Sequence, residues 1–322
     1  MIGTGGELPG SGTEDTQVAD FINRRFQQAF DTSPVWPRYV VAGEPRRIAS
    51  LAIEGTTGTS ASDVNGIYYL LGSVTGTGVE SGSDLYYKLD SNETQSAING
   101  TIIYRNTTPA WVVSRSGIVA KNADGTFTVS NTGTAALTEV DLDKKSNPAN
   151  VETWSLGTNI TTAPAPIFKV QFIPYTELRT DSIDVGRNNI GNFNKIHKTQ
   201  PFLNNSALEY EFFVDEDGAH ILNLRSTDTR TAFVTYKKEF TPFTVTSDFY
   251  NSTVEVPSEF FNFIAHAVYA DFLRVQNRQQ EAIAEEQIAQ TYLAQELEKI
   301  DIRNNNNTVN KRFSTYVNRQ SR

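Results

Sequence analysis

Cysteine is absent from this 322-residue chain, and histidine occurs only three times. Without cysteine the chain can form no disulfide, offer no thiolate to a metal ion and use no thiol as a nucleophile. Its apolar runs are all shorter than the roughly 18 residues that a membrane-spanning helix needs. The first residues contain neither a basic nor an apolar stretch, which predicts no secretory signal. We therefore expect a soluble protein made in a cytoplasm.

Basic residues are outnumbered by acidic ones, and the net charge is −9. A surface that binds the phosphates of a nucleic acid is normally basic. The chain as a whole is therefore not expected to wrap around a nucleic acid.

Catalytic motifs are also missing. There is no Gly-x-Ser-x-Gly elbow and no glycine loop that opens a helix to hold phosphates. His266 lies in an apolar helical pattern, which favours a hydrogen-bonded packing role, and His197 lies in a polar stretch predicted to be an exposed loop. His220 is the best candidate metal ligand, together with Asp215 and Asp217, but side chains from one tight hairpin do not make a complete ligand set. We predict no catalytic residue, no cofactor and no metal ion.

The clearest helical pattern lies at residues 257–301. Pro257 suits the first position of a helix, because it has no N–H group for the helix start to leave unpaired. Apolar residues recur after it at steps of three and four, which predicts that they share one buried face. This face consists of Phe261, Ile264, Ala265, Val268, Phe272 and Val275. A polar stretch separates it from a second series, so we predict two helices or one bent helix. The second series is Ala289, Leu293, Leu297 and Ile300.

Before this region the composition changes twice. Residues 1–15 are rich in glycine, serine and acids, which is typical of a flexible N-terminus. An amphipathic helix capped by Thr16 is predicted next. Its apolar face is Val18, Phe21, Ile22, Phe26, Ala29 and Phe30. A strand is expected near residues 48–53.

Residues 55–159 hold twelve of the 21 glycines and six short β-prone runs separated by turn signals. This pattern predicts a small antiparallel sandwich or barrel. The runs are 66–71, 84–89, 101–105, 110–114, 126–130 and 152–156. The aromatic residues predict core packing, with a sugar-stacking platform as the alternative. They are Tyr68, Tyr69, Tyr86, Tyr87, Tyr104, Trp111 and Trp154.

A proline-containing linker at 161–166 leads to a second β region. Alternation predicts a strand at 168–174, and the polar stretch 180–206 is expected to be irregular. A meander follows, with strands at 208–214, 221–224 and 231–237, and Asp215–Gly218 forms its first turn.

The end of the chain, 302–322, carries five basic residues and no acidic one, whereas 257–301 has eight acidic and three basic residues, a net charge of −5. Such a segment is often only a solvated tail. The apolar residues within it favour an arm that binds a partner. The candidate arm residues are Arg303, Val309, Lys311, Arg312, Phe313, Tyr316, Val317, Arg319 and Arg322.

Several short motifs at the two ends of the chain occur in a distinctive order. They are Val18–Phe26 (VADFINRRF) with Trp36, Phe213–Gly218 (FVDEDG), Val234–Lys237 (VTYK), Val256–Phe260 (VPSEF), His266–Phe272 (HAVYADF), Glu281–Ala284 (EAIA) and Tyr292–Leu293. With the order of the predicted elements, this pattern resembles the head-to-tail adaptor, or connector ring, proteins of tailed double-stranded DNA bacteriophages, especially short-tailed ones. The resemblance covers about 16–54 and 165–301.

The resemblance implies an α+β fold. An N-terminal helix and a C-terminal helical hairpin would form a core with a β-meander, from residues 16–54 and 160–301. The segment 55–159 would be an inserted small β-sandwich or barrel domain, to which no family role can be carried over. Residues 302–322 would be an extended C-terminal arm.

The resemblance also implies a structural virion protein and not an enzyme. It would form a ring, commonly of twelve copies, at the head–tail junction. Its partners would be the portal protein, a tail nozzle or tail-tube protein and tail fibres. Genomic DNA would pass through the ring without specific binding, because an acidic or neutral wall does not hold phosphates.

Within such a ring, polar residues of 257–301 are predicted to face neighbouring subunits or the channel. They are Arg274, Arg278, Glu281, Glu285, Glu286, Glu296 and Glu298. Two other classes of function stay open. One is a virion binding module whose 55–159 domain recognises a glycan or a tail fibre, and the other, less favoured, is a carbohydrate-active enzyme.

Overall fold

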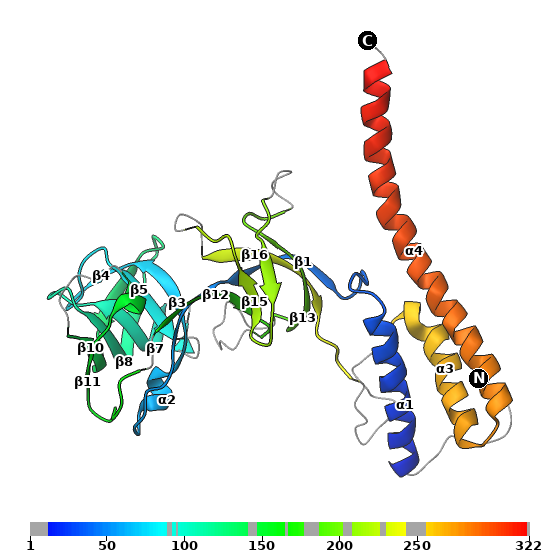
Figure 1. Ribbon diagram of the computed structural model, residues 1–322, viewed down its shortest axis with the longest axis horizontal. Helices are drawn as coiled ribbons and strands as arrows, with labels where there is room; N and C mark the ends of the chain where they lie inside the picture. Colours follow the sequence, from blue (N-terminus) through cyan, green and yellow to red (C-terminus); the bar gives the residue numbers. More distant parts are fainter. Residues whose placement is uncertain are drawn as a thin grey trace. The chain divides into compact units, whose positions relative to one another are not determined.

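The computed structural model describes residues 12–88, 92–94, 96–140, 147–164, 167–176, 187–201, 208–225, 230–242 and 256–320. Only the backbone is described for 12–16, 92, 93, 169 and 302–320. The chain divides into two compact units (Figure 1). The helical unit comprises Met1–Val40 and Glu239–Arg322, and the β unit comprises Val41–Lys238. The predicted α+β class with a C-terminal helical hairpin is confirmed.

The helical unit consists of α1 (Gly12–Asp31), α3 (Ser258–Val275) and α4 (Gln279–Gln320). α1 starts at Gly12, so Thr16 lies inside the helix and does not cap it as predicted. Pro257 is the N-cap of α3 rather than its first residue. The turn between α3 and α4 passes through Asn277, whose φ of 60° is left-handed, and asparagine tolerates this conformation better than most residues do.

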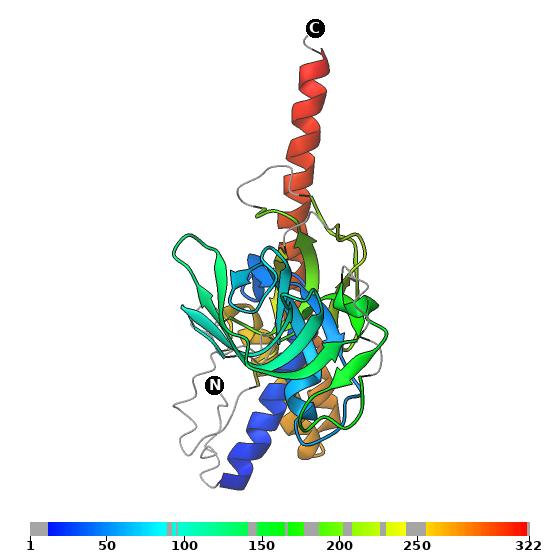
Figure 2. The same cartoon turned by 90° about the vertical axis from the view of Figure 1, so that its left-hand side faces the viewer.

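α4 runs back along α3 and continues past the N-terminal end of α3 in both views (Figure 1, Figure 2). The segment 302–320, predicted to be an extended arm, is therefore helical backbone. The segment contains neither proline nor glycine. Nothing in it stops a helix that is already formed, because propagation needs only one residue to be ordered per hydrogen bond.

The core of the helical unit lies between its three helices. It is formed by Phe26, Ala29, Trp36, Phe260, Phe263, Ile264, Ala267, Ala289, Leu293 and Ile300. The buried face of α3 is therefore not the predicted one. Ile264 is buried as expected, but Phe261 is 62% exposed and Val275 is 58% exposed. α3 has apolar residues on two faces, and periodicity alone does not tell which of them other helices cover.

The β unit contains a 13-stranded sheet. Its main path runs in the order β11-β10-β8-β7-β5-β3-β2-β12-β15-β14, while β4, β6 and β9 pair beside this path. The strands of residues 49–139 are β2 (Ala49–Ile53), β3 (Gly66–Ser73), β4 (Thr75–Gly76), β5 (Asp84–Lys88), β6 (Asn92–Glu93), β7 (Ala97–Arg105), β8 (Trp111–Lys121), β9 (Phe127–Asn131) and β10 (Thr134–Glu139). The later strands are β11 (Trp154–Leu156), β12 (Phe168–Pro174), β14 (Phe212–Val214) and β15 (Gly218–Ile221).

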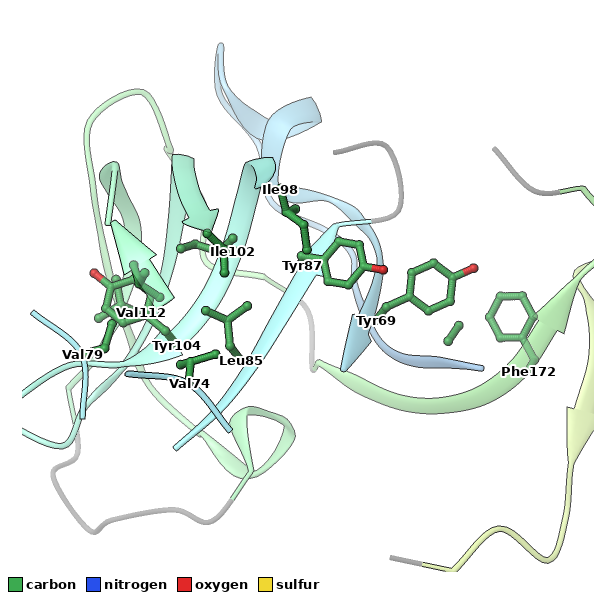
Figure 3. Packing of buried hydrophobic residues seen from close by; sticks show 13 residues of the cluster. Tyr69, Val74, Val79, Leu85, Tyr87, Ile98, Ile102, Tyr104, Val112 and Phe172 are labelled. Atoms are coloured by element: carbon green, nitrogen blue, oxygen red, sulfur yellow. The ribbon is translucent and has the colours of Figure 1, made fainter. Parts of the chain in front are cut away.

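The sheet is buried on both faces around β7. Ile102 and Tyr104 join a cluster with Leu85 on one face, and Figure 3 shows this layer with Tyr69 beside Tyr87. Ile103 joins a second cluster on the other face. There α2 (Ala61–Val64) contributes Val64 and the short helix η1 (Pro148–Asn150) contributes Ala149. All six predicted runs of 66–156 overlap strands, but β4, β6 and β10 were not predicted.

A second, three-stranded sheet has the order β1-β16-β13. Its strands are β1 (Val40–Arg47), β13 (Ile190–His197) and β16 (Thr231–Lys238). It shares a core with β12 and β15, formed by residues such as Ile48, Ile173, Ile196, Tyr210 and Val234. The Tyr210 N–H donates to the Ile196 carbonyl over 2.8 Å, so residues 208–210 run along β13 before the chain enters β14.

β13 contradicts the predicted irregular segment 180–206. Its register with β16 shifts between Ile190 and Asn192 and again between Phe193 and Lys195. These irregularities place its buried apolar residues three apart instead of two apart, so the alternation that signals a strand is lost. The division of the chain into two units does not test the predicted limits 55–159 of the inserted domain. These limits stay a prediction.

Candidate interaction surface on the helical unit

A buried ion network joins the three helices of the helical unit. Arg25 of α1 donates from Nη2 to Oδ1 of Asp271 over 2.6 Å and from Nε to Oδ2 over 2.7 Å. The same guanidinium donates to both carboxylate oxygens of Glu286 on α4, over 3.0 and 2.8 Å. Asp271 belongs to α3. The Arg25 side chain of α1 therefore contacts both α3 and α4 and joins the three helices. A bidentate arginine–carboxylate pair is the strongest common form of such a contact.

Two further arginines complete the network. Arg24 donates to Asp271 over 3.1 Å, and Arg274 donates to Asp271 over 2.8 Å and to Glu286 over 3.2 Å. Burial on its own raises the pKa of Asp271, but the hydrogen bonds and charges of the arginines outweigh it and hold that pKa below its ordinary value. The pKa of Glu286 is lowered in the same way, against burial, by Gln290, Arg25 and Arg274. Both carboxylates therefore stay charged in the folded unit.

A pocket of about 520 Å³ lies between α1 and α3 beside this network. It is lined by Phe21, Arg24, Arg25, Gln28, Asp271, Arg274 and Val275. Three arginines and one aspartate give the lining an excess of positive charge, with an aromatic and an aliphatic residue at its margin. Such a lining suits an acidic side chain that is carried on an apolar surface.

The predicted interface residues are spread over different environments. Arg274 and Glu286 belong to the buried network. Glu285 lies 2.6 Å from Nδ1 of His266, whose ring stacks on Tyr292. Arg278 pairs with Glu281 at the exposed start of α4, and Glu296 pairs with Lys299. Glu298 is exposed.

Three apolar residues of α3 that the sequence pattern placed on the buried face are exposed instead. Phe261, Phe272 and Val275 are 62%, 39% and 58% exposed. With Ala265 and Val268 they form a stripe at alternating steps of four and three residues. α4 has exposed apolar residues as well, since Ile283, Ile288 and Tyr292 are 55%, 42% and 37% exposed. A cluster of exposed apolar residues on one small unit is typical of an interaction surface.

The side chains of the candidate arm lie outside the described residues. This applies to Arg303, Val309, Lys311, Arg312, Phe313, Tyr316, Val317, Arg319 and Arg322. Their role in binding stays a prediction.

The histidines have structural surroundings. His266 has the predicted hydrogen-bonded packing role, with Glu285 and Tyr292 as its partners. The prediction for His197 is wrong, because His197 ends β13 and is only 7% exposed, and this burial lowers the pKa of its imidazole. The exposed loop was predicted because the strand around His197 was not recognised.

The structure brings Asp215, Asp217 and His220 together, with ligand atoms within 4.8 Å of one another. Their geometry is also that of a hairpin turn. Asp215 Oδ1 accepts the N–H groups of Asp217 and Gly218, and its Oδ2 lies 2.8 Å from Nε2 of His220. The His220 ring stacks between Phe172 and Phe213 of the neighbouring strands. These contacts involve the side chains of Asp215 and His220, whereas Asp217 takes part only through its backbone N–H.

Gly218 closes the same turn at φ 150°. A Cβ atom there would lie 2.1 Å from the carbonyl oxygen of Ile173, so only glycine lets β15 pair closely with β12.

The aromatic residues of 66–154 lie in the core, as the favoured interpretation predicted. All seven are at most 9% exposed, including both tryptophans, Trp111 and Trp154. A sugar-stacking platform is therefore not formed by these rings. The described residues also include no helix that is long and apolar enough to cross a membrane.

Comparison with known protein families gives no match, and comparisons with curated proteins and with solved structures give no significant match. The case for a function therefore depends on the surfaces of the helical unit and on the resemblance described above.

Proposed function

We propose that this protein is a head-to-tail adaptor of a tailed bacteriophage, which forms a ring between portal and tail. The observation that carries this proposal is the exposed apolar surface of a helical unit whose own core is already complete. Phe261 and Val275 are more than half exposed although the residues next to them, Phe260 and Arg274, take part in the core and the ion network. A monomer gains nothing from such residues, whereas a ring buries them between subunits.

The charge of the chain supports a channel that DNA traverses. The net charge is −9, and acidic residues outnumber basic ones by five in 257–301. A wall with this charge repels phosphates weakly and does not bind them, so DNA can slide past. We infer that the ring extends the portal channel and carries the tail nozzle or tail tube below it.

The β unit has a separate task in this proposal. Residues 55–159 supply most of the two cores on the faces of the 13-stranded sheet, which they share with neighbours such as Leu51, Ile53 and Phe172, and they lie outside the helical unit. A β unit whose cores are formed by its own residues can be placed at the rim of a ring without disturbing the contacts between helices. We propose that it contacts tail components such as fibres.

The C-terminal part of α4 is the proposed portal-binding segment. Residues 302–322 carry five basic residues and no acidic one, and α4 projects beyond α3 by most of this segment. A projecting basic helix can pair with an acidic surface, and several copies in one ring add their affinities through effective concentration. The helical backbone of this segment favours a helix that binds in a groove over an extended arm that adds a strand to a sheet.

Truncation after Asp301 tests this segment. We expect the truncated protein to keep the circular dichroism of a folded helical unit, because Ile300 is the last core residue among the α4 residues whose side chains are described. Its co-sedimentation with purified portal rings should fall strongly, since five positive charges per subunit are lost. A full-length variant with the five basic residues changed to glutamine serves as the matched control for the loss of charge alone. Undiminished sedimentation of both variants would show that the segment does not bind the portal.

A further inference from the structure

The helical unit exposes two unlike surfaces on different helices. The first is the α3 surface, formed by the exposed residues Phe261, Ala265, Phe272 and Val275, the half-buried Val268 that also packs against the core of its own chain, and the arginine pocket beside them. The second is the α4 surface, formed by Ile288 and Tyr292, which lie one helical turn apart, together with Glu281 on the same side of the helix. We propose that the α3 surface of one copy of this chain binds the α4 surface of the next copy. This inference depends on the proposed ring.

The spacing of the α3 stripe indicates that its partner is a helix. Steps of four, three, four and three residues give an average of 3.5, which is the repeat of a helix that packs along another helix through a straight seam. Ile264 and Asp271, beside the stripe, are already covered by the core and by Arg25. The partner helix therefore lies along the stripe itself, at the side of α3 that the chain's own helices leave open.

Charge complementarity identifies the α4 surface as the partner. The pocket beside Val275 is lined by three arginines and one aspartate. Arg24 is 63% exposed, and within the described residues its only charged partner is Asp271. Residues 279–301 of α4 contain six acidic residues and one basic residue. Glu281 is exposed on the same side of α4 as Ile288, and its pair with the exposed Arg278 is weak enough for it to exchange that partner for an arginine of another copy.

Two different surfaces that bind each other give a head-to-tail contact. Such a contact does not end at a dimer, because every added copy offers a new free surface, and it closes into a ring when the rotation between copies allows it. A contact of the α3 surface with itself would end at a two-fold dimer. The two arrangements therefore predict different products for the same variants.

The test uses one variant in each surface. Phe272→Glu places a charge in the α3 stripe, and Ile288→Glu places a charge in the α4 surface. Either variant alone should self-associate at least about 30-fold more weakly than the wild type, as expected for the loss of a central apolar contact. Mixed together, they should form one-to-one heterodimers and nothing larger, because each variant still has one intact surface. Analytical ultracentrifugation and native mass spectrometry measure these species.

A matched control lies outside both surfaces. Leu222 of the β unit is 62% exposed, and Leu222→Glu should leave self-association at the wild-type level. Melting temperatures of all the variants should agree with the wild type within a few degrees, because each changed side chain is exposed in the single chain.

Several outcomes overturn the proposal. Homodimers of Ile288→Glu alone would show that the α3 surface binds itself. A wild-type chain that stays monomeric at several hundred micromolar, together with a lower melting temperature of Phe272→Glu, would show that the chain covers this surface itself. Rings of either variant at wild-type strength would place the contact elsewhere and leave the adaptor function intact. If the wild type forms no ring even with portal present, the adaptor function itself fails.

Discussion

Replacing Arg25 by alanine should lower the free energy of unfolding of the helical unit by about 3–5 kcal/mol, because removing one partner of a buried ion pair leaves the other charge uncompensated. The side chains of Arg25 and Asp271 are only 10% and 6% exposed, so water cannot replace the lost contacts. Chemical denaturation followed by far-ultraviolet circular dichroism measures this change. The signal mainly reports the helical unit, since α2, with four residues, is the only α-helix among the described residues of the β unit.

Arg278→Ala is the matched control for this prediction. Arg278 and Glu281 form an ion pair three residues apart in the sequence, as Asp271 and Arg274 do. Unlike Asp271, however, Arg278 and Glu281 are both about half exposed. An exposed pair of this kind contributes about 0.5 kcal/mol or less. A loss below about 1 kcal/mol for Arg25→Ala would contradict the assignment of Arg25 as the residue that joins the three helices.

The same network makes the stability of the helical unit depend on pH in the acidic range. The pKa values of Asp271 and Glu286 are lowered by folding, so both groups are more easily protonated in the unfolded chain. Their contribution to stability is therefore complete above their ordinary pKa values of about 4 and is lost as the pH falls through the lower folded values. Stability of the wild-type helical unit should fall steeply below that pH, and the slope should be smaller in Arg25→Ala.

Phe260→Ala should destabilise the helical unit by about 3–5 kcal/mol, the usual cost of removing a buried aromatic ring from a packed core. Phe260 is 1% exposed. Its ring packs edge-on against Trp36 with centroids 4.7 Å apart and also contacts Phe26 and Tyr39. Trp36 is the only tryptophan of the helical unit. Denaturant melts followed by circular dichroism measure the change in the free energy of unfolding.

Phe261→Ala is the control at the next position of the same helix. Its ring is 62% exposed, so the change in free energy of the single chain should be about 0.5 kcal/mol or less. The comparison distinguishes the observed buried face of α3 from the face that periodicity predicted. Equal losses of stability in the two variants, or a larger loss in Phe261→Ala, would show that the face predicted from periodicity is buried.

The β strands of 66–156 could be predicted because their turn signals are local. Asn106–Pro109 and Asp124-Gly125 mark where the chain reverses between β7, β8 and β9. Asn99-Gly100, a pair of the same type, lies inside β7 and does not form a turn. β13 could not be predicted in this way. Its alternation is broken where its register with β16 shifts, and only the pairing with β16 reveals that Ile190, Phe193 and Ile196 belong to one strand.

The ion network could not be derived from local patterns either. Arg25 and Asp271 are separated by 246 positions, so nothing near either residue names its partner. The sequence does contain one sign of a buried ion pair, which is a charged residue next to apolar helix positions. Asp271 lies between Ala270 and Phe272, and Arg25 precedes Phe26. Charged residues in such positions are almost always paired when they are buried. The predicted interface residues Arg274 and Glu286 were found through their polarity, but the structure places them in this network.

Electron microscopy of the purified full-length protein, alone and mixed with portal rings, shows whether this chain forms a ring. We expect closed rings with rotational symmetry, in free solution or assembled on the portal, with the helical units at the contacts between subunits. A stable trimer in both samples would contradict it and would indicate a spike or fibre protein instead.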